Sequence, residues 1–264
     1  MKNYKGAAFF DVDGTLVDER LGIFTPTERV KKAIESLKDK GFLIGLATGR
    51  ARCYVPDTGI DFDCYVSCNG AAAEIGGKEI FNDYIEYTEL KKILDYLAKE
   101  GIHYALETPQ ICYYEKTAQK EIYEMIDVFK IDRNCFIPYE GGEVKINKLL
   151  ISFKNMEQYD KISRDFAGEY DIMRHHRNLS ADIRKKKISK AVGIERVIEY
   201  TGVDINDTYA FGDDFNDTEM LGAVGHGIAM TPHAESLDDV AEYITCGVGG
   251  DGIYMGLKHY GLAE

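Results

Sequence analysis

The stretch Ala7-Ala8-Phe9-Phe10-Asp11-Val12-Asp13-Gly14-Thr15 runs from four apolar residues directly into a polar cluster. A short apolar run of this kind predicts a strand that is buried on both faces of a parallel sheet. Asp11 and Asp13 are two positions apart, so their side chains would lie on one side if the extended backbone continued. Gly14 permits a tight turn whose N–H groups can bind an anion. One carboxylate could then act as a nucleophile while the other moves a proton.

Two further polar clusters follow predicted strands. Thr48-Gly49-Arg50 comes after the strand 42–47, and Gly212-Asp213-Asp214-Phe215-Asn216-Asp217 comes after the strand 208–211. Ligands of open parallel sheets bind beyond the carboxyl ends of the strands. Aspartate and glycine are also common turn residues after a strand, so one cluster alone would decide nothing. Three clusters at strand ends favour a functional site.

The strand ends would bring together three carboxylates, those of Asp11, Asp13 and Asp213. Carboxylates packed this closely repel one another, and a divalent cation is the usual remedy. Oxygen ligands with room for water indicate Mg²⁺ rather than zinc, so we expect Mg²⁺ as the cofactor. An aspartate that attacks phosphorus would form an aspartyl-phosphate, which splits one difficult hydrolysis into two transfers.

The remaining pattern predicts an α/β fold with an insertion. Helices are expected after the capping box Thr25-Pro26-Thr27-Glu28 and from about Ser189, so strands and helices alternate near both ends of the chain. We expect a parallel-sheet core of residues 1–83 and 188–264, with residues 84–187 inserted as a second α/β domain. The insert is predicted to contain helices at 89–99, 117–130 and 159–166, and strands at 102–106, 149–153 and 171–174.

Composition and charge restrict the partners. The 264 residues carry 45 acidic and 32 basic side chains, and the formal charge of −13 repels nucleic acid and anionic lipid. No apolar run approaches the ~18 residues of a membrane span, and no signal-peptide core is visible. The six cysteines form no zinc-binding pattern. We therefore expect a cytoplasmic protein with reduced, mostly buried thiols and no nucleic-acid or membrane partner.

The polar clusters together resemble the motifs of the haloacid dehalogenase-like (HAD) superfamily. Its four motifs are matched by Asp11-Val12-Asp13-Gly14-Thr15, by Thr48 with Gly49-Arg50, by Lys190 at a helix start, and by residues 212–217. Its Cof-type branch is resembled by Asn69-Gly70, Gly227-Ile228-Ala229-Met230 and Asp251-Gly252-Ile253. The resemblance implies a Rossmann-like core with an α/β cap inserted between the second and third motifs. It also implies a Mg²⁺-dependent phosphatase for small phosphate monoesters, such as sugar phosphates.

The resemblance implies a role for each residue of the motifs. Asp11 would be the nucleophile, and Asp13 would protonate the leaving oxygen and then activate water. The metal would be bound by Asp11, by Asp213 and by the backbone carbonyl of Asp13. The remaining assignments are phosphate binding by Val12, Thr48, Gly49, Lys190 and Asn216, and orientation of the site by Asp214, Asp217 and Arg50.

Several alternatives stay open at this point. Lys187 is the fallback for Lys190, because basic residues crowd positions 184–187. Arg50 could equally form an ion pair with a neighbouring loop. Phosphomutases share the four motifs, and a receiver-like signalling module also carries a phosphorylatable aspartate on a parallel sheet. The sequence leaves the physiological substrate and the oligomeric state open.

Overall fold

The computed structural model describes residues 3–128, 130–175 and 178–264. The chain forms two compact units, each with its own sheet. The first, which we call the core unit, comprises Met1–Arg50, Val55–Phe81 and Ser189–Glu264. The second unit comprises Ala51–Tyr54 and Asn82–Ile188. Among the described residues, no helix has the length and apolar character that crossing a membrane requires.

The core unit is built on an eight-stranded sheet in the order β14-β13-β12-β1-β2-β3-β4-β5. The strands from β14 to β3 in this order are parallel, and β4 is antiparallel to β3. Because β1 lies between β2 and β12, the carboxyl ends of these three strands meet at one edge of the sheet. The strands span Gly6–Phe10 (β1), Phe42–Ala47 (β2), Cys64–Ser67 (β3), Ala72–Ile75 (β4), Lys78–Asn82 (β5), Thr208–Gly212 (β12), His226–Ala229 (β13) and Tyr243–Ile244 (β14).

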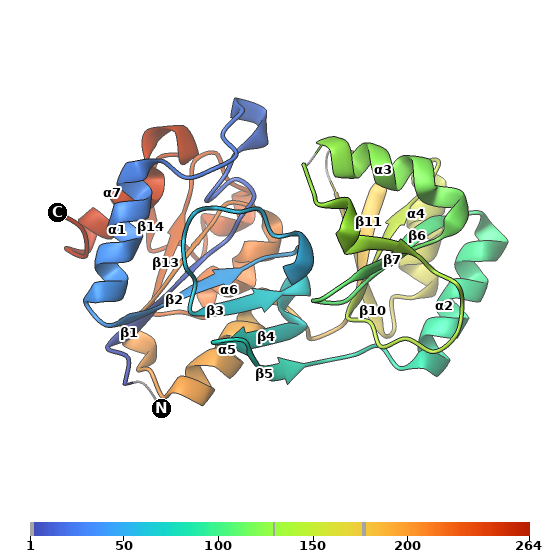
Figure 1. Cartoon of the computed structure of the whole chain (residues 1–264), viewed down its shortest axis with the longest axis horizontal. Helices are drawn as coiled ribbons and strands as arrows, with labels where there is room; N and C mark the ends of the chain where they lie inside the picture. The colour runs from blue at the N-terminus through green and yellow to red at the C-terminus, as the bar shows by residue number, and fades with distance from the viewer. Residues whose placement is uncertain (1–2, 129, 176–177) are drawn as a thin grey trace. The chain divides into compact units, whose positions relative to one another are not determined.

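Alternate residues of β1 pack on opposite faces of the core sheet. The helices that cover these faces are α1 (Glu28–Asp39), α5 (Lys190–Thr201), α6 (Thr218–Gly222) and α7 (Gly252–His259). Ala8 and Phe10 pack in the same apolar cluster as α1 and α7, which lie side by side (Figure 1). Ala7 and Phe9 pack with α5 and α6 in the cluster on the other face. Burial on both faces explains why this strand is a continuous apolar run.

The second unit has a six-stranded mixed sheet in the order β10-β11-β9-β6-β7-β8. One face of this sheet forms an apolar cluster with helices α2 and α4. The strands are His103–Glu107 (β6), Cys112–Tyr114 (β7), Phe136–Pro138 (β8), Lys148–Ser152 (β9), Tyr170–Arg174 (β10) and Ser180–Lys185 (β11). The helices are Tyr87–Glu100 (α2), Gln119–Val128 (α3) and Met156–Asp165 (α4).

The other face of this second sheet carries a buried charged group. Lys148 Nζ lies 2.8 Å from Asp182 Oδ2 and 3.2 Å from Glu107 Oε2. Tyr54 donates a 2.8 Å hydrogen bond to the same Glu107 oxygen, and His175 Nε2 lies 3.5 Å from Asp182 Oδ1. Burial by itself raises the pKa of Asp182, but Lys148 and His175 outweigh burial and hold that pKa below its ordinary value. The ionised form of Asp182 therefore stabilises the folded second unit.

Candidate active site

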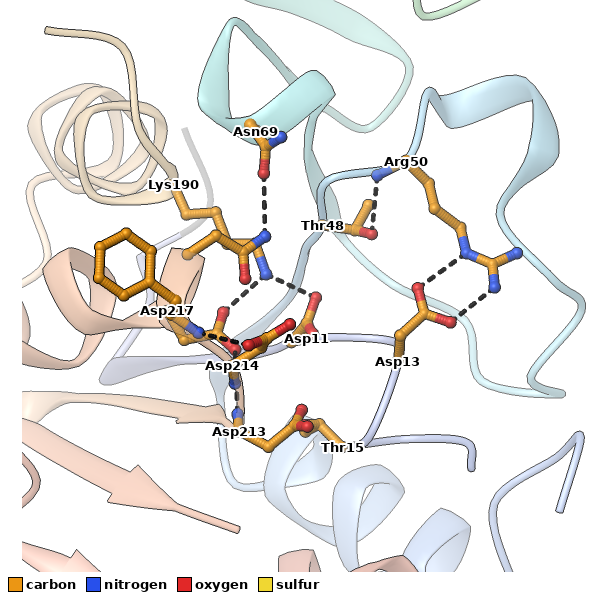
Figure 2. Close-up of polar contacts among 12 residues, drawn as sticks. Asp11, Asp13, Thr15, Thr48, Arg50, Asn69, Lys190, Asp213, Asp214 and Asp217 are labelled. Carbon is orange, nitrogen blue, oxygen red and sulfur yellow. Dashed lines mark hydrogen bonds and ion pairs between the residues drawn. The ribbon is translucent and has the colours of Figure 1, made fainter. Parts of the chain in front are cut away.

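The loops after β1, β2 and β12 carry the polar clusters singled out in the sequence, and Figure 2 shows their side chains. Asp11 directly follows β1, and Asp213 directly follows β12. Carboxylate oxygens of Asp11, Asp213 and Asp217 lie within 4.8 Å of one another. We call these three side chains the acidic centre. Asp217, expected from the resemblance only as an orienting neighbour, is a full member of it.

Lys190 brings a positive charge into the acidic centre. It is the first residue of α5, and its Nζ donates hydrogen bonds to Asp11 Oδ1 at 2.7 Å and Asp217 Oδ1 at 2.6 Å (Figure 2). Burial by itself lowers the pKa of Lys190, but the attraction of the two carboxylates outweighs burial and raises that pKa. Lys190 is therefore a permanent cation, whereas Lys187 is exposed.

One lysine does not neutralise three carboxylates, and the protonation of the acidic centre reflects this imbalance. Burial, followed by repulsion from Asp11 and Asp217, raises the pKa of Asp213 to about 9. Burial also raises the pKa of Asp11 to about 8, although Lys190 opposes the shift. A buried, oxygen-only donor set with excess negative charge fits a hard divalent cation such as Mg²⁺.

The loop after β1 approaches Asp213 closely. The carbonyl of Val12 accepts hydrogen bonds from the N–H groups of Leu16 and Val17, each at 3.0 Å, so the chain turns immediately after Asp11. Gly14 has a φ of +87°, and a Cβ added there would lie 2.0 Å from Asp213 Oδ2. Thr15 Oγ1 lies 3.2 Å from Asp213 Oδ1, to which it donates. Only glycine fits this position, because both the backbone angle and the carboxylate exclude a side chain.

Asp217 also organises the loop after β12. Its Oδ2 accepts hydrogen bonds from the N–H groups of Asp213 at 2.9 Å and Asp214 at 3.1 Å. The Asp214 side chain accepts a hydrogen bond from Phe215 N at 2.7 Å. It also accepts from the backbone of Asp217, which completes a capping box at the short helical turn that leads into α6. The two carboxylates therefore fix the backbone around Asp213 by local capping. Asp214 lies beside the acidic centre but is not a member of it.

Asp13 faces away from the acidic centre, towards the loop after β2. Arg50 donates to Asp13 Oδ2 from Nε at 2.9 Å and to Oδ1 from Nη2 at 2.6 Å (Figure 2). Arg50 Nη2 also lies 3.2 Å from Glu19 Oε1. The backbone N–H of Arg50 donates to Thr48 Oγ1 at 3.1 Å, which places the buried Thr48 in the same turn. Arg50 therefore holds the side chain that the resemblance assigns to acid–base chemistry.

A pair of asparagines links the loop after β3 to the loop after β12. Asn216 Nδ2 donates to Asn69 Oδ1 at 3.0 Å. A Cβ added to Gly49 would lie 3.0 Å from that same Asn69 oxygen, so the phosphate-binding turn expected at Thr48-Gly49 packs against the pair. Sequence reasoning gave Asn69 no role. The signal available for it was the Asn69-Gly70 dipeptide, which is part of the resemblance to the Cof-type branch.

The chain is similar to known proteins over nearly its whole length. The profile of a family described as haloacid dehalogenase-like hydrolase matches residues 8–257. The chain belongs to the haloacid dehalogenase-like hydrolase family. It is 32% identical to a Bacillus subtilis protein named "Putative phosphatase YkrA", over 97% of this chain and 98% of YkrA. The chain is a HAD phosphatase of the Cof type, a phosphoric monoester hydrolase.

Two solved structures share the fold of this chain. A hypothetical protein from Geobacillus kaustophilus HTA426 is 29% identical, with a TM-score of 0.83 over 98% of this chain and 99% of that chain. The HAD subclass IIB sugar phosphatase BT4131 has a TM-score of 0.84 over 97% of this chain and 99% of that chain, at 24% identity. The predicted fold class, a parallel-sheet core with an inserted α/β cap, is confirmed.

Proposed function

We propose that this HAD phosphatase hydrolyses small phosphate monoesters, with sugar phosphates as the first class to test, through an aspartyl-phosphate on Asp11 and with Mg²⁺ as the cofactor. The observation that carries the proposal is the geometry around Asp11. A buried lysine holds one of its oxygens at 2.7 Å, and two further carboxylates lie beside it. The contact with Lys190 favours the ionised form of Asp11, and a divalent cation among the three carboxylates would offset the burial and repulsion that raise the pKa of Asp11, so that it could act as a nucleophile.

The metal would be held by the carboxylates of Asp11 and Asp213 and by the backbone carbonyl of Asp13. Bound Mg²⁺ would neutralise charge on the phosphoryl oxygens. The fit of the acidic centre to a divalent cation, argued from its excess negative charge, supports this assignment.

Asp11 performs the first half of the proposed reaction. Lys190 engages Oδ1 of Asp11, so Oδ2 is the oxygen that we assign to attack on phosphorus. As the new bond forms, the bond from phosphorus to the leaving oxygen breaks and Asp13 gives that oxygen a proton. In the second half, Asp13 takes a proton from water and the water oxygen attacks phosphorus. The bond from phosphorus to Asp11 then breaks, and inorganic phosphate departs.

The phosphoryl oxygens would be held by groups on the loops around the acidic centre. Thr48 and the N–H groups of Val12 and Gly49 would bind them, with Lys190 and Asn216 completing the set. Such positioning and charge neutralisation supply most of the catalysis in phosphoryl transfer. The second unit, which we propose to be the cap expected at residues 84–187, would select the leaving group.

Hydrolysis competes with two other outcomes for an aspartyl-phosphate. A phosphomutase would return the phosphoryl group to a sugar, and a signalling module would keep it for long periods. The phosphatase name of the relative that covers nearly the whole chain supports hydrolysis. Asp13 lies in the loop after β1 and is held there by Arg50. This position supports rapid turnover, because Asp13 could provide acid–base chemistry beside Asp11.

The test is a panel of phosphate esters assayed for phosphate release with and without Mg²⁺, beside Asp11→Asn, Asp13→Asn and the exposed control Asp39→Asn. We expect Mg²⁺-dependent release that Asp11→Asn abolishes, Asp13→Asn lowers severely and Asp39→Asn leaves unchanged. Acid quenching of Asp13→Asn should trap phosphate on Asp11. Full activity in Asp11→Asn would overturn the nucleophile, an isomeric sugar phosphate in place of phosphate would reveal a mutase, and a stable phosphoprotein formed from acetyl phosphate would reveal a signalling module.

A further inference from the structure

Three cysteines from distant parts of the sequence meet in the second unit. Cys53 lies in the short helical turn Arg52–Tyr54, Cys112 is the first residue of β7, and Cys135 ends the turn Arg133–Cys135. The Sγ atoms of Cys53 and Cys112 are 3.8 Å apart, and Cys135 Sγ donates to the carbonyl of Cys53 at 2.8 Å. All three side chains are in the reduced, thiol state.

Backbone hydrogen bonds hold the first two cysteines in place. Cys53 N donates to the carbonyl of Pro109 at 2.8 Å, in the turn that connects β6 to β7. Cys112 is paired with Glu107 on β6 and with Phe136 on β8. A disulfide needs its sulfurs about 2 Å apart, so Cys53 and Cys112 must approach by only about 2 Å to be bonded. The closure we infer is a rotation of the two side chains towards each other.

The three thiols differ in reactivity. The hydrogen bond with Cys112 lowers the pKa of Cys53, against the opposing effect of burial. Burial, together with Cys53, raises the pKa of Cys135 to about 11. Cys53 is also partly exposed, whereas Cys112 and Cys135 are buried. The thiolate is the reactive form of cysteine. Of these three residues, Cys53 should therefore be the first to attack an external disulfide.

We propose that Cys53 and Cys112 form a thiol-modification site that reacts with low-molecular-weight disulfides and closes to an internal disulfide. The Cys53 thiolate attacks one sulfur of the small disulfide, whose S–S bond breaks and releases one small thiolate. The released thiolate takes the proton of Cys112. The Cys112 sulfur then attacks the Cys53 sulfur, the mixed S–S bond breaks, and the second small thiolate leaves and takes from water the proton that Cys53 had given up. One small disulfide is reduced to two thiols as two protein thiols are oxidised to one disulfide.

Two other cysteines, Cys135 and Cys246, are expected to behave differently from Cys53 and Cys112. Cys135 directs its thiol to a backbone carbonyl and has the raised pKa, so it stays reduced. Cys246 is exposed in the core unit and donates to the carbonyl of Gly250 at 2.9 Å. It should therefore take up the small thiol without closing to an internal disulfide, and it reports whether the reagent has acted at all.

The experiment treats the full chain with increasing oxidised glutathione, quenches with acid, alkylates the remaining thiols and maps linked peptides by mass spectrometry. We expect the wild type to lose Cys53 and Cys112 from its six alkylatable thiols through one direct link, which reduced glutathione reverses. Cys135→Ser should keep the link. Cys53→Ser should lose it while Cys246 still takes up glutathione.

Three outcomes would overturn the proposal. The first is a link from Cys53 to Cys135, the second is glutathione that stays on Cys53 without a link to Cys112, and the third is a Cys53 that stays alkylatable when Cys246 is fully modified. Each can be scored on the wild-type chain, so the proposal does not depend on the folding of a variant. Circular dichroism of Cys53→Ser and Cys135→Ser confirms that their results refer to folded protein.

Discussion

Arg50 holds Asp13 through two hydrogen bonds, from Nε at 2.9 Å and from Nη2 at 2.6 Å, so that the planar guanidinium meets both oxygens of one carboxylate. This fork fixes the orientation of a side chain that is itself half-exposed. The sequence left two interpretations of Arg50 open, and both contacts are present: Asp13 belongs to the proposed catalytic residues, and Glu19 lies in a neighbouring loop. Arg50 is therefore a positioning residue for Asp13.

Removing this fork should slow turnover without removing the nucleophile. Arg50→Lys keeps the charge but loses the two-pronged geometry, and Arg50→Ala loses both, so we expect kcat to fall about tenfold and about a hundredfold respectively, with smaller changes in KM. Arg133→Ala, which removes an exposed contact of one guanidinium nitrogen with both oxygens of Asp127, serves as the control and should leave kcat unchanged. Wild-type kcat in Arg50→Ala would contradict the positioning role.

Gly14→Ala should damage the acidic centre by contact. The new Cβ would overlap the Asp213 carboxylate, so we expect the affinity for Mg²⁺ and kcat/KM to fall at least about tenfold, as for a displaced metal ligand. Gly22→Ala is the matched control. Its φ of +70° carries a similar backbone strain of about 1 kcal/mol, but no atom lies within 4 Å of the new Cβ. Equal losses in the two variants would assign the effect to backbone strain rather than to Asp213.

Lys190→Met should leave two buried carboxylates without their cation. We expect a loss of about 3–5 kcal/mol in the free energy of unfolding and no measurable turnover. Lys187→Met changes an exposed lysine and should behave as wild type, which also tests the fallback assignment. The double variant Lys190→Met/Asp217→Asn removes one of the stranded charges, so it should recover part of the stability without recovering turnover. Urea unfolding and phosphate release measure the two effects separately.

The second unit should lose stability in acid through Asp182. Its pKa in the folded state lies below the unfolded value of about 3.9, so its contribution is complete above about pH 4 and is lost as the pH falls towards the folded pKa. Asp182→Asn should cost about 2 kcal/mol or more at pH 7, and the difference from wild type should shrink below about pH 4. Urea-dependent hydrogen exchange of β9 and β11 measures this. Asp127→Asn, on an exposed pair with Arg133 in the same unit, is the control and should cost about 0–1 kcal/mol.

The sequence predicted the strand ends of the core unit well, because each combines a buried apolar run with a polar cluster. β1, β2 and β12 lie where the apolar runs placed them, and Asp11 and Asp213 meet as expected. The direction of Asp13 did not follow from spacing. The carbonyl of Val12 closes a turn immediately after Asp11, so the extended backbone on which the expectation rested does not continue.

The second unit was harder to predict from the sequence. β6, β9 and β10 lie close to the expected strands, but β7, β8 and β11 were not anticipated. β11 alternates charged and apolar residues, and its Asp182 and Arg184 are buried rather than facing solvent. Burial of those charges depends on partners from other strands, which local pattern cannot reveal. The meeting of Cys53 with Cys112 was missed for the same reason, since tertiary folding alone brings them together.

One oxygen of Asp217 accepts a hydrogen bond from the ammonium of Lys190, and the other accepts from the backbone N–H groups of Asp213 and Asp214. A single carboxyl group thus positions both the lysine that we propose binds phosphate and the aspartate that we propose binds the metal. Neither half of the centre can be re-engineered alone, and a designer who wants a different ion or a different anion here has to redesign both together.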